Sequence, residues 1–315
     1  MSNAGRLAAI FGCEALALSP DELAFFRDCD PFGFILFARN IENPDQVVRL
    51  TSQLRDAVGR DAPVLIDQEG GRVQRMRAPH WRDWSPPLDA AHAAGADAAR
   101  VLGLRARIIA EELRAVGIDA NCAPVADIAG PETHPFLRNR CYGETAVHVC
   151  ERARSVADAH LAAGVLPVVK HLPGHGRATA DTHLNLPTVT ASPADLAAHD
   201  FAPFRALADL PMVAHVAPQA TGSYAVVAGN ANTQTQVAGT TADYLQVQNW
   251  PLALGRGFEP GEEAAGAAVC LLGQTVRDKL FGGSDPVDAL IASGMAVIGT
   301  PDDAIAISAS MCSHM

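Results

Sequence analysis

Six short apolar runs alternate with amphipathic or polar stretches along the first two-thirds of the chain. The runs lie at residues 8–12, 32–37, 63–66, 118–122, 165–169 and 211–216. They are mostly apolar and often β-branched, a pattern typical of strands that are covered on both faces of a sheet. Strands that alternate with helical segments predict an α/β protein with a parallel sheet.

Helix starts and stops fall between these runs. Ser19-Pro20-Asp21-Glu22 predicts a capping box with proline at the first helical position. Asn43 and Ser192 are each followed by proline and predict two further helix starts. A long helical stretch is expected over about residues 88–116, with Gly117 as its stop.

The spacing of these elements fits an eight-stranded (β/α)8 TIM-type barrel, which needs about 250 residues or more. A doubly wound open sheet is the alternative, but no G-x-G-x-x-G sequence follows the first strand to indicate a dinucleotide-binding version of it. The last two barrel strands are uncertain. Residues 266–272 and 295–299 could supply them, with a final helix that opens at Pro301.

The composition changes after the sixth apolar run. Ala, Gly, Asn, Thr and Gln dominate residues 217–249 and little periodicity remains, which predicts a loop or a poorly ordered segment. We therefore divide the chain into a barrel portion, residues 8–216, and an atypical C-terminal region, residues 217–315, which could complete the barrel. Unpaired strand edges would make this region the least stable part of the chain.

The whole chain has 315 residues, 49% of them hydrophobic and 19% charged, an ordinary globular composition. A formal net charge of −11 favours solubility and argues against nucleic acid or an anionic membrane as a partner. No apolar run reaches the ~18 residues of a membrane span and no signal segment opens the sequence, so we expect a cytoplasmic protein. The seven cysteines are scattered without C-x-x-C spacing, which predicts reduced and mostly buried thiols.

Polar residues gather directly after the third and fifth apolar runs. The stretch from Asp67 to Arg75 contains two carboxylates, a glycine pair and two arginines, and the stretch from Lys170 to His183 contains three histidines and one aspartate. Because the carboxyl ends of parallel strands meet at one edge of a sheet, we expect these groups to form one site. The alternative for the first stretch is a loop-fixing ion pair between Asp67 and Arg75.

The sequence Lys-His-Leu-Pro-Gly-His-Gly at residues 170–176, followed by Asp-Thr-His at residues 181–183, resembles the signature of family 3 glycoside hydrolases. It is similar to that of the bacterial β-N-acetylglucosaminidases that recycle cell-wall fragments, and the resemblance extends from about residue 8 to residue 216. It implies a barrel, a retaining mechanism, a muropeptide substrate that contains N-acetylglucosamine, and no cofactor or metal.

The resemblance also implies roles for individual residues. Asp181 and His183 match the family's catalytic pair, in which the histidine is the acid and base and the aspartate orients it. The residues that match the family's substrate contacts are Asp67, Arg75, Arg140, Lys170 and His171. His215, at the end of the sixth run, either lines the same site or is a packed core histidine.

The carboxylate nucleophile of the family has no clear counterpart. Family members carry Ser-Asp-Asp-Leu, or a close variant, after an apolar strand that follows the sixth, and no such segment stands after residue 216. Ser284-Asp285 is the nearest match, but it follows Phe281-Gly282-Gly283 rather than an apolar run, which makes Asp285 a weak candidate. The C-terminal region could instead derive from another protein, by fusion or frameshift.

The sequence therefore predicts a retaining β-N-acetylhexosaminidase that releases N-acetylglucosamine from peptidoglycan fragments and acts as a monomer, without nucleic acid or membrane partners. One alternative is a sugar-binding protein that lacks the nucleophile. Another is a metal hydrolase in which His171, His175 and His183 bind zinc together with Asp181, although no helical His-x-x-x-His pair supports it.

Overall fold

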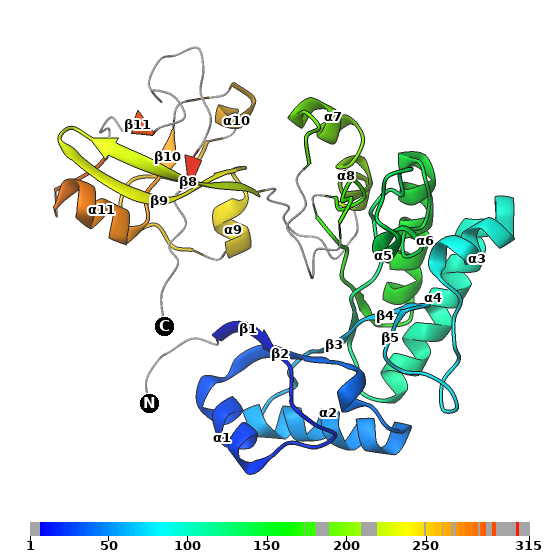
Figure 1. Cartoon of the computed structure of the whole chain (residues 1–315). Coiled ribbons are helices and arrows are strands. Elements are labelled where there is room, and N and C mark those ends of the chain that lie inside the picture. Colours follow the sequence, from blue (N-terminus) through cyan, green and yellow to red (C-terminus); the bar gives the residue numbers. More distant parts are fainter. Residues whose placement is uncertain are drawn as a thin grey trace. The chain divides into compact units, whose positions relative to one another are not determined.

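A computed structural model describes residues 7–172, 174–180, 189–208, 219–248, 250–259, 261–265, 267, 269–282, 284–287, 292–293 and 307–308. The chain divides into two compact units, Met1–Asp209 and Leu210–Met315 (Figure 1). Each unit has its own β-sheet and its own buried apolar residues.

The first unit is built on a parallel sheet with the strand order β1-β2-β3-β6-β7. Its strands are β1 (Leu7–Phe11), β2 (Pro31–Leu36), β3 (Val64–Ile66), β6 (Ala120–Asn121) and β7 (Leu166–Pro167). Neighbours in this sheet follow one another in the sequence, as in a (β/α) barrel, whereas a doubly wound sheet reverses its order at a switch point. The fold is therefore α/β of the TIM-barrel type, although the strands do not close into a barrel within the described residues.

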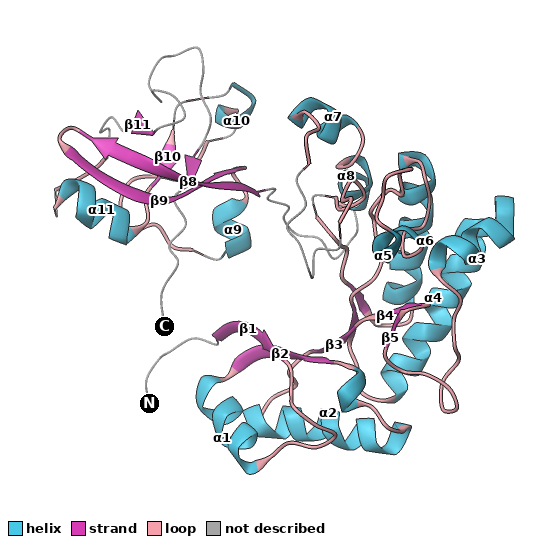
Figure 2. Ribbon diagram, in the orientation of Figure 1, coloured by secondary structure: helices cyan, strands magenta, loops and turns pink. Residues whose placement is uncertain are grey.

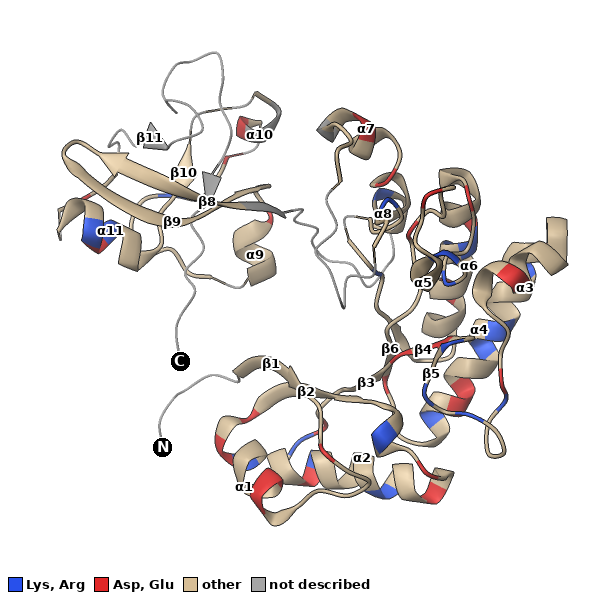
Figure 3. Cartoon of the chain, viewed as in Figure 1, with Lys and Arg blue, Asp and Glu red and all other residues tan. Residues whose placement is uncertain are grey.

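These strands confirm five of the six predicted ones, and the sixth, residues 211–216, lies outside the described residues. The helices of the first unit are α1 (Pro20–Cys29), α2 (Pro44–Val58), α3 (Pro87–Ala94), α4 (Ala98–Ala115), α5 (Pro135–Arg138), α6 (Ala146–Ala162), α7 (Pro193–Ala198) and α8 (Ala202–Leu207), with the 3-10 turns η1 (Ala38–Asn40) and η2 (Gly95–Asp97). Helices α1 and α2 cover one face of the sheet (Figure 2) and bury Phe26 and Leu50 against Phe34 and Ile66. Residues of both charge signs occur along α2 and α4 (Figure 3).

The predicted helix starts are confirmed. The Ser19 hydroxyl accepts from the backbone N–H of Glu22, and the Glu22 carboxylate accepts from the backbone N–H of Ser19, which completes the capping box. Asn43 caps α2 and Ser192 caps α7 through their side-chain oxygens.

The helical stretch expected over residues 88–116 is interrupted. Gly95, with φ of +54°, ends α3 and separates it from α4. Helix α4 then lies against α6, where a Cβ on Gly103 would stand 2.4 Å from the Ser155 hydroxyl. That hydroxyl donates to the carbonyl of Ala99 at 2.8 Å. A glycine in α4 therefore permits the close approach of the two helices.

The second unit contains a five-stranded sheet with the order β10-β12-β9-β8-β11. Its elements are β8 (Gln219–Ala228), β9 (Ala231–Thr240), α9 (Tyr244–Gln248), α10 (Glu262–Ala265), β10 (Cys270–Leu271), α11 (Gln274–Phe281), β11 (Ala292–Ser293) and β12 (Ile307–Ser308). Val276 and Leu280 of α11 pack on Val226 and Val237 of the β8–β9 hairpin.

The prediction of a loop over residues 217–249 is wrong. Strands β8 and β9 pair antiparallel over ten residues each and are joined by Gly229-Asn230, with φ of +58° at the glycine. A Gly-Asn pair between stretches that contain Val, Thr and Tyr is a hairpin signal. This signal was weak because both faces of the two strands carry small and polar residues. Neither strand contains a charged residue (Figure 3).

The structure describes only one of the two segments that were predicted as the seventh and eighth barrel strands. Residues 270–271 form β10, which pairs with β12 in the second unit's sheet, so no pairing with the first sheet is seen in the described residues. Residues 295–299 and Pro301 lie outside the described residues. The role of residues 217–315 in completing a barrel stays a prediction.

None of the described helices is long and apolar enough to cross a membrane. The cysteines in the described part of the chain are free, as predicted: Cys13, Cys29, Cys122, Cys141, Cys150 and Cys270. Their predicted burial is confirmed in part, because Cys13 and Cys141 are buried whereas Cys270 is exposed.

Candidate functional site

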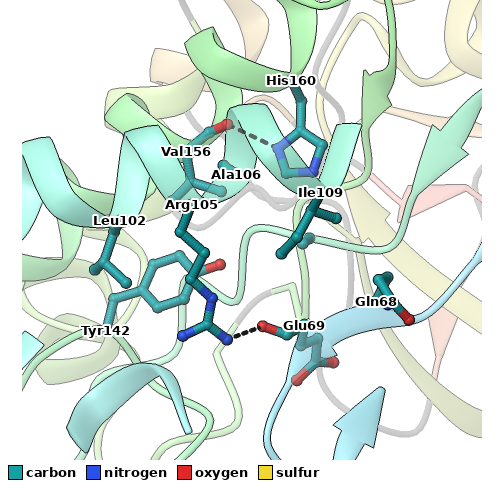
Figure 4. Close-up of a pocket in the computed structure, with 10 residues that line it drawn as sticks. Gln68, Glu69, Leu102, Arg105, Ala106, Ile109, Tyr142, Val156 and His160 are labelled. Carbon is teal, nitrogen blue, oxygen red and sulfur yellow. Dashed lines mark hydrogen bonds between the residues drawn. The ribbon is translucent and has the colours of Figure 1, made fainter. Parts of the chain in front are cut away.

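The loop after β3 begins with a short hairpin of β4 (Gln68–Gly70) and β5 (Val73–Gln74). Gly70 has φ of +103°, and a Cβ there would lie 1.7 Å from Nη2 of Arg105, so the position requires glycine. Arg105 uses this space to donate from Nη2 to the backbone carbonyl of Glu69 at 2.6 Å (Figure 4). A buried cation thus fixes the backbone of the hairpin from the interior side.

Asn121 of β6 and His160 of α6 hold the same hairpin. Asn121 Oδ1 accepts from the backbone N–H of Gln68 at 2.9 Å, and its Nδ2 donates to the Gln68 carbonyl at 3.1 Å and to His160 Nε2 at 2.9 Å. His160 Nδ1 donates to the Val156 carbonyl at 2.8 Å (Figure 4). These two bonds suit a neutral imidazole, and burial lowers the pKa of His160. The hairpin backbone is therefore held by uncharged contacts from Asn121 in addition to the charged contact from Arg105.

Asp67, the residue after β3, lies between two cations. Lys170 Nζ is 2.7 Å from Oδ1 and Arg75 Nη2 is 3.0 Å from Oδ2. Burial alone would raise the pKa of Asp67, but the charge of Lys170 and the hydrogen bonds from both cations lower it below its ordinary value. The ion pair between Asp67 and Arg75 that the sequence offered as an alternative is thus present, within a larger network.

Glu69 follows Asp67 by two positions, and its side chain has no exposed surface. Arg140 donates to it twice, from Nε to Oε2 at 2.9 Å and from Nη2 to Oε1 at 2.8 Å. Lys170 Nζ contacts Oε1 at 2.6 Å. Burial alone would lower the pKa of Arg140, but the hydrogen bonds and charge of Glu69 raise it. Glu69 therefore fixes two cations at once, one of them in a bidentate pair.

Asp127 is the second carboxylate without exposed side-chain surface. Its Oδ2 accepts from Nδ1 of His171 at 2.6 Å, and its Oδ1 accepts from the backbone N–H of His175 at 2.7 Å. Arg140 Nη2 lies 3.3 Å from Nε2 of His171. Asp127 thus links His171, and through it Arg140, to the loop after β7.

That loop is anchored on the segment that follows β6. Thr133 Oγ1 donates to the Gly176 carbonyl. A Cβ on Gly176 would lie 2.0 Å from the Ile128 carbonyl oxygen, so the two backbones are in direct contact. Residues 174–180 therefore follow a fixed path that leads directly to Asp181 in the sequence.

One continuous network joins all the predicted substrate-binding residues: Asp67, Arg75, Arg140, Lys170 and His171. Glu69 and Asp127 complete it. Glu69 is one of the two carboxylates that the sequence placed in the site, without a role of its own, whereas Asp127 was not predicted as a site residue. For Asp127 the available signal was a polar residue a few positions after an apolar run. Asp181, His183 and His215 lie outside the described residues, and the functional roles of all these groups stay predictions.

Asp127, His171 and His175 are the possible metal ligands that the described part of the chain brings together. Their ligand atoms lie within 4.8 Å of one another. Both oxygens of Asp127 already accept hydrogen bonds from this pair, one from the His171 ring and one from the His175 backbone. The group shares two histidines with the zinc set considered from the sequence, whose other members, Asp181 and His183, lie outside the described residues.

Comparison with known proteins gives two family matches. The model of the glycosyl hydrolase family 3 N terminal domain matches residues 28–237. The model of the MacB-like periplasmic core domain matches residues 166–310, which is less than half of the chain.

Individual relatives match the same first part of the chain. The β-hexosaminidase of Methylococcus capsulatus is 41% identical over 195 residues, 60% of this chain and 56% of that protein. The β-hexosaminidase of Xylella fastidiosa is 34% identical over 215 residues, 66% of this chain and 63% of that protein. NagZ of Neisseria gonorrhoeae, solved in complex with N-trifluoroacetyl-D-glucosamine, has a TM-score of 0.61 at 29% identity over 64% of this chain and 60% of that chain. The chain thus spans less than two thirds of the length of these relatives.

Proposed function

Because the chain belongs to glycosyl hydrolase family 3, whose N-terminal domain matches residues 28–237, we propose that it is a retaining β-N-acetylhexosaminidase. Its substrate is N-acetylglucosamine linked in peptidoglycan fragments, and it acts in cell-wall recycling in the cytoplasm, as a monomer. The relatives named β-hexosaminidase support the reaction. The sugar analogue bound to the Neisseria gonorrhoeae protein supports the substrate class.

The observation that carries the proposal is the charge-balanced network around Asp67. Arg75, Arg140 and Lys170 contact the carboxylates of Asp67 and Glu69, and His171 joins Asp127 to Arg140. The three cations equal the three carboxylates in number, so a neutral sugar can bind without upsetting this balance. Asp67 and His171 keep 18% and 33% of their side chains exposed, and Lys170 keeps 14%. Together they offer acceptors and donors to hydroxyl and acetamido groups, which need both.

In the proposed reaction a carboxylate attacks the anomeric carbon while the bond to the leaving oxygen breaks, and His183 gives that oxygen its proton. In the second step His183 takes a proton from water, and the water oxygen displaces the carboxylate with overall retention. Asp181 orients the imidazole and stabilises its charged form. The anchoring of residues 174–180 supports this assignment, because Asp181 follows them directly in the sequence.

Of the groups that this reaction needs, the nucleophile is the one for which this chain offers the weakest candidate. Asp285 lies in the second unit, where its Oδ1 accepts from the backbone N–H of Val287 at 3.0 Å. The chain has no Ser-Asp-Asp segment after residue 216. This favours a second candidate function, a protein that binds the sugar and does not hydrolyse its glycosides.

Turnover of para-nitrophenyl N-acetyl-β-D-glucosaminide by the purified chain separates the two functions. Release of nitrophenol from this substrate, and not from para-nitrophenyl β-D-glucoside, is the result that the enzyme proposal predicts. N-acetylglucosamine binding in calorimetry without turnover would favour the binding protein. Absence of both binding and turnover would contradict both functions.

A further inference from the structure

The two oxygens of Asp127 hold two different elements of the site. Oδ2 accepts from the ring of His171 and Oδ1 accepts from the backbone of His175, at 2.6 and 2.7 Å. The first bond fixes the rotation and the tautomer of an imidazole. The second fixes the backbone of the loop that leads to Asp181. A buried carboxylate that accepts from both makes the two arrangements depend on each other.

We infer that Asp127 is a positioning residue that couples the sugar contact His171 to the backbone of the loop over residues 174–180. The inference rests on the proposed sugar-binding function and deepens it. Asp127 itself has no exposed side-chain surface, so it acts through these partners and does not touch the sugar.

The coupling has a consequence for the kind of contact that His171 makes. With Nδ1 donating to Asp127, Nε2 of the neutral ring has a lone pair and no hydrogen. In the structure this atom lies 3.3 Å from Nη2 of Arg140, a donor. A sugar hydroxyl can therefore donate to Nε2 only in place of Arg140, whereas an ether oxygen, which has no hydrogen to donate, cannot bind that atom.

The loop over residues 174–180 is held by contacts to two adjacent residues. Asp127 holds the amide of His175, and Thr133 holds the carbonyl of Gly176, the next residue. Loss of Asp127 would release the ring of His171 and the first of these two adjacent anchors together. Loss of another loop anchor would leave the ring in place.

A matched control contacts the same loop from outside it. Asp200 is also a buried carboxylate, 5% exposed, and its Oδ2 accepts from Nε of Arg177 at 2.8 Å. Asp200→Asn removes the charge that holds the loop at Arg177 without touching the contacts of His171. Asp127→Asn leaves one oxygen for three donors, the ring of His171 and the backbone N–H groups of His171 and His175, because its amide nitrogen cannot accept from any of them.

The first measurement uses the unmodified protein, labelled with ¹⁵N in its histidine rings. The expected result is a hydrogen on Nδ1 of His171, and a shift of the Nε2 resonance when N-acetylglucosamine is added. A hydrogen on Nε2 in the free protein would overturn the inference. This arm needs no variant and does not depend on whether Asp127→Asn folds.

The second measurement compares variants by calorimetry with N-acetylglucosamine. Asp127→Asn is expected to lose the single His171 tautomer and to bind about 10- to 100-fold more weakly, the range known for carboxylate partners of metal-bound histidines. Asp200→Asn is expected to keep both the tautomer and the affinity. Equal losses in the two variants would show that Asp127 acts only as a loop anchor, which overturns the coupling.

The proposed function and the positioning role of Asp127 can be refuted independently of each other. If the unmodified chain neither binds N-acetylglucosamine nor hydrolyses its nitrophenyl glycoside, the proposed function is wrong. The tautomer of His171 in the unmodified chain and in Asp127→Asn then still decides whether Asp127 positions the ring.

Discussion

Glu69→Gln is expected to be the most destabilising single isosteric change in the network. Glu69 is fully buried and accepts three contacts, two from Arg140 and one from Lys170. Glutamine keeps one oxygen and places an amide nitrogen, a donor, against a cation. Removing one partner of a buried ion pair costs about 3–5 kcal/mol, a large part of the ~5–15 kcal/mol by which a domain is stable.

The assay is chemical and thermal unfolding of the intact chain in a Trp250→Phe background. Trp81 and Trp84 of the first unit then remain as the fluorescent residues, since the sequence has three tryptophans. For a unit of this size each kcal/mol shifts Tm by ~2–4 °C, so the expected loss corresponds to roughly 6–20 °C.

Glu111→Gln is the matched control for this variant. Glu111 is exposed and pairs with Arg107 one helical turn away at 3.1 Å, so its loss is expected to cost ~0.5 kcal/mol or less. A loss for Glu69→Gln no larger than that of Glu111→Gln would refute the reasoning that Glu69 balances two buried cations.

Three further changes have defined outcomes. Because the pKa of Asp67 is lowered in the folded state, its stabilising contribution is complete above the unfolded-state pKa of about 3.9 and is lost as the pH falls through the folded-state value. The difference in unfolding free energy between the parent and Asp67→Asn should therefore shrink below about pH 4; a difference that grows there would contradict the sign. Gly176→Ala forces a methyl group against the Ile128 carbonyl and should cost about 1–3 kcal/mol in thermal unfolding; an unchanged Tm would show that the loop can move away. If the chain hydrolyses, His183→Ala should lower turnover of a natural disaccharide by roughly 10²–10⁴-fold, and of the nitrophenyl glycoside much less, because nitrophenolate leaves without protonation. Equal losses on both substrates would assign His183 a structural or binding role.

The parts of the fold that the sequence predicted are those with local physical causes. The capping box at Ser19 depends on residues within one turn, and it is present as predicted. Asp67 and Lys170 are 103 positions apart, yet their meeting followed from their places after two strands of one parallel sheet. The residue types at 19–22 were sufficient for the first, and the pattern of apolar runs was sufficient for the second.

The buried carboxylates could not be predicted in the same way. Whether Glu69 points outward or inward depends on the backbone at Gly70, and that backbone is set by Arg105, far away in the sequence. Likewise, Asp127 is buried because its partners come from the loop after β7. Side-chain direction at such positions is a tertiary property, and a local pattern does not contain it.

The β8–β9 hairpin was missed for a different reason. Thr233, Thr235 and Val237 alternate with more exposed residues in β9, a period of two that indicates a strand. The other residues are small or polar, so the contrast between the faces is weak. Pairing with β8 across the Gly229-Asn230 turn supplies the backbone hydrogen bonds that composition did not predict.

That the Asp67 network binds N-acetylglucosamine is tested most directly by isothermal titration calorimetry of this sugar into the intact chain and into Asp67→Asn, with Glu111→Gln as the control. The intact chain and the control are expected to bind equally. Asp67→Asn is expected to bind about 10- to 100-fold more weakly, because hydrogen bonds to a charged group contribute ~1.5–3 kcal/mol. Equal affinity in all three proteins, or no binding by the intact chain, would contradict the assignment.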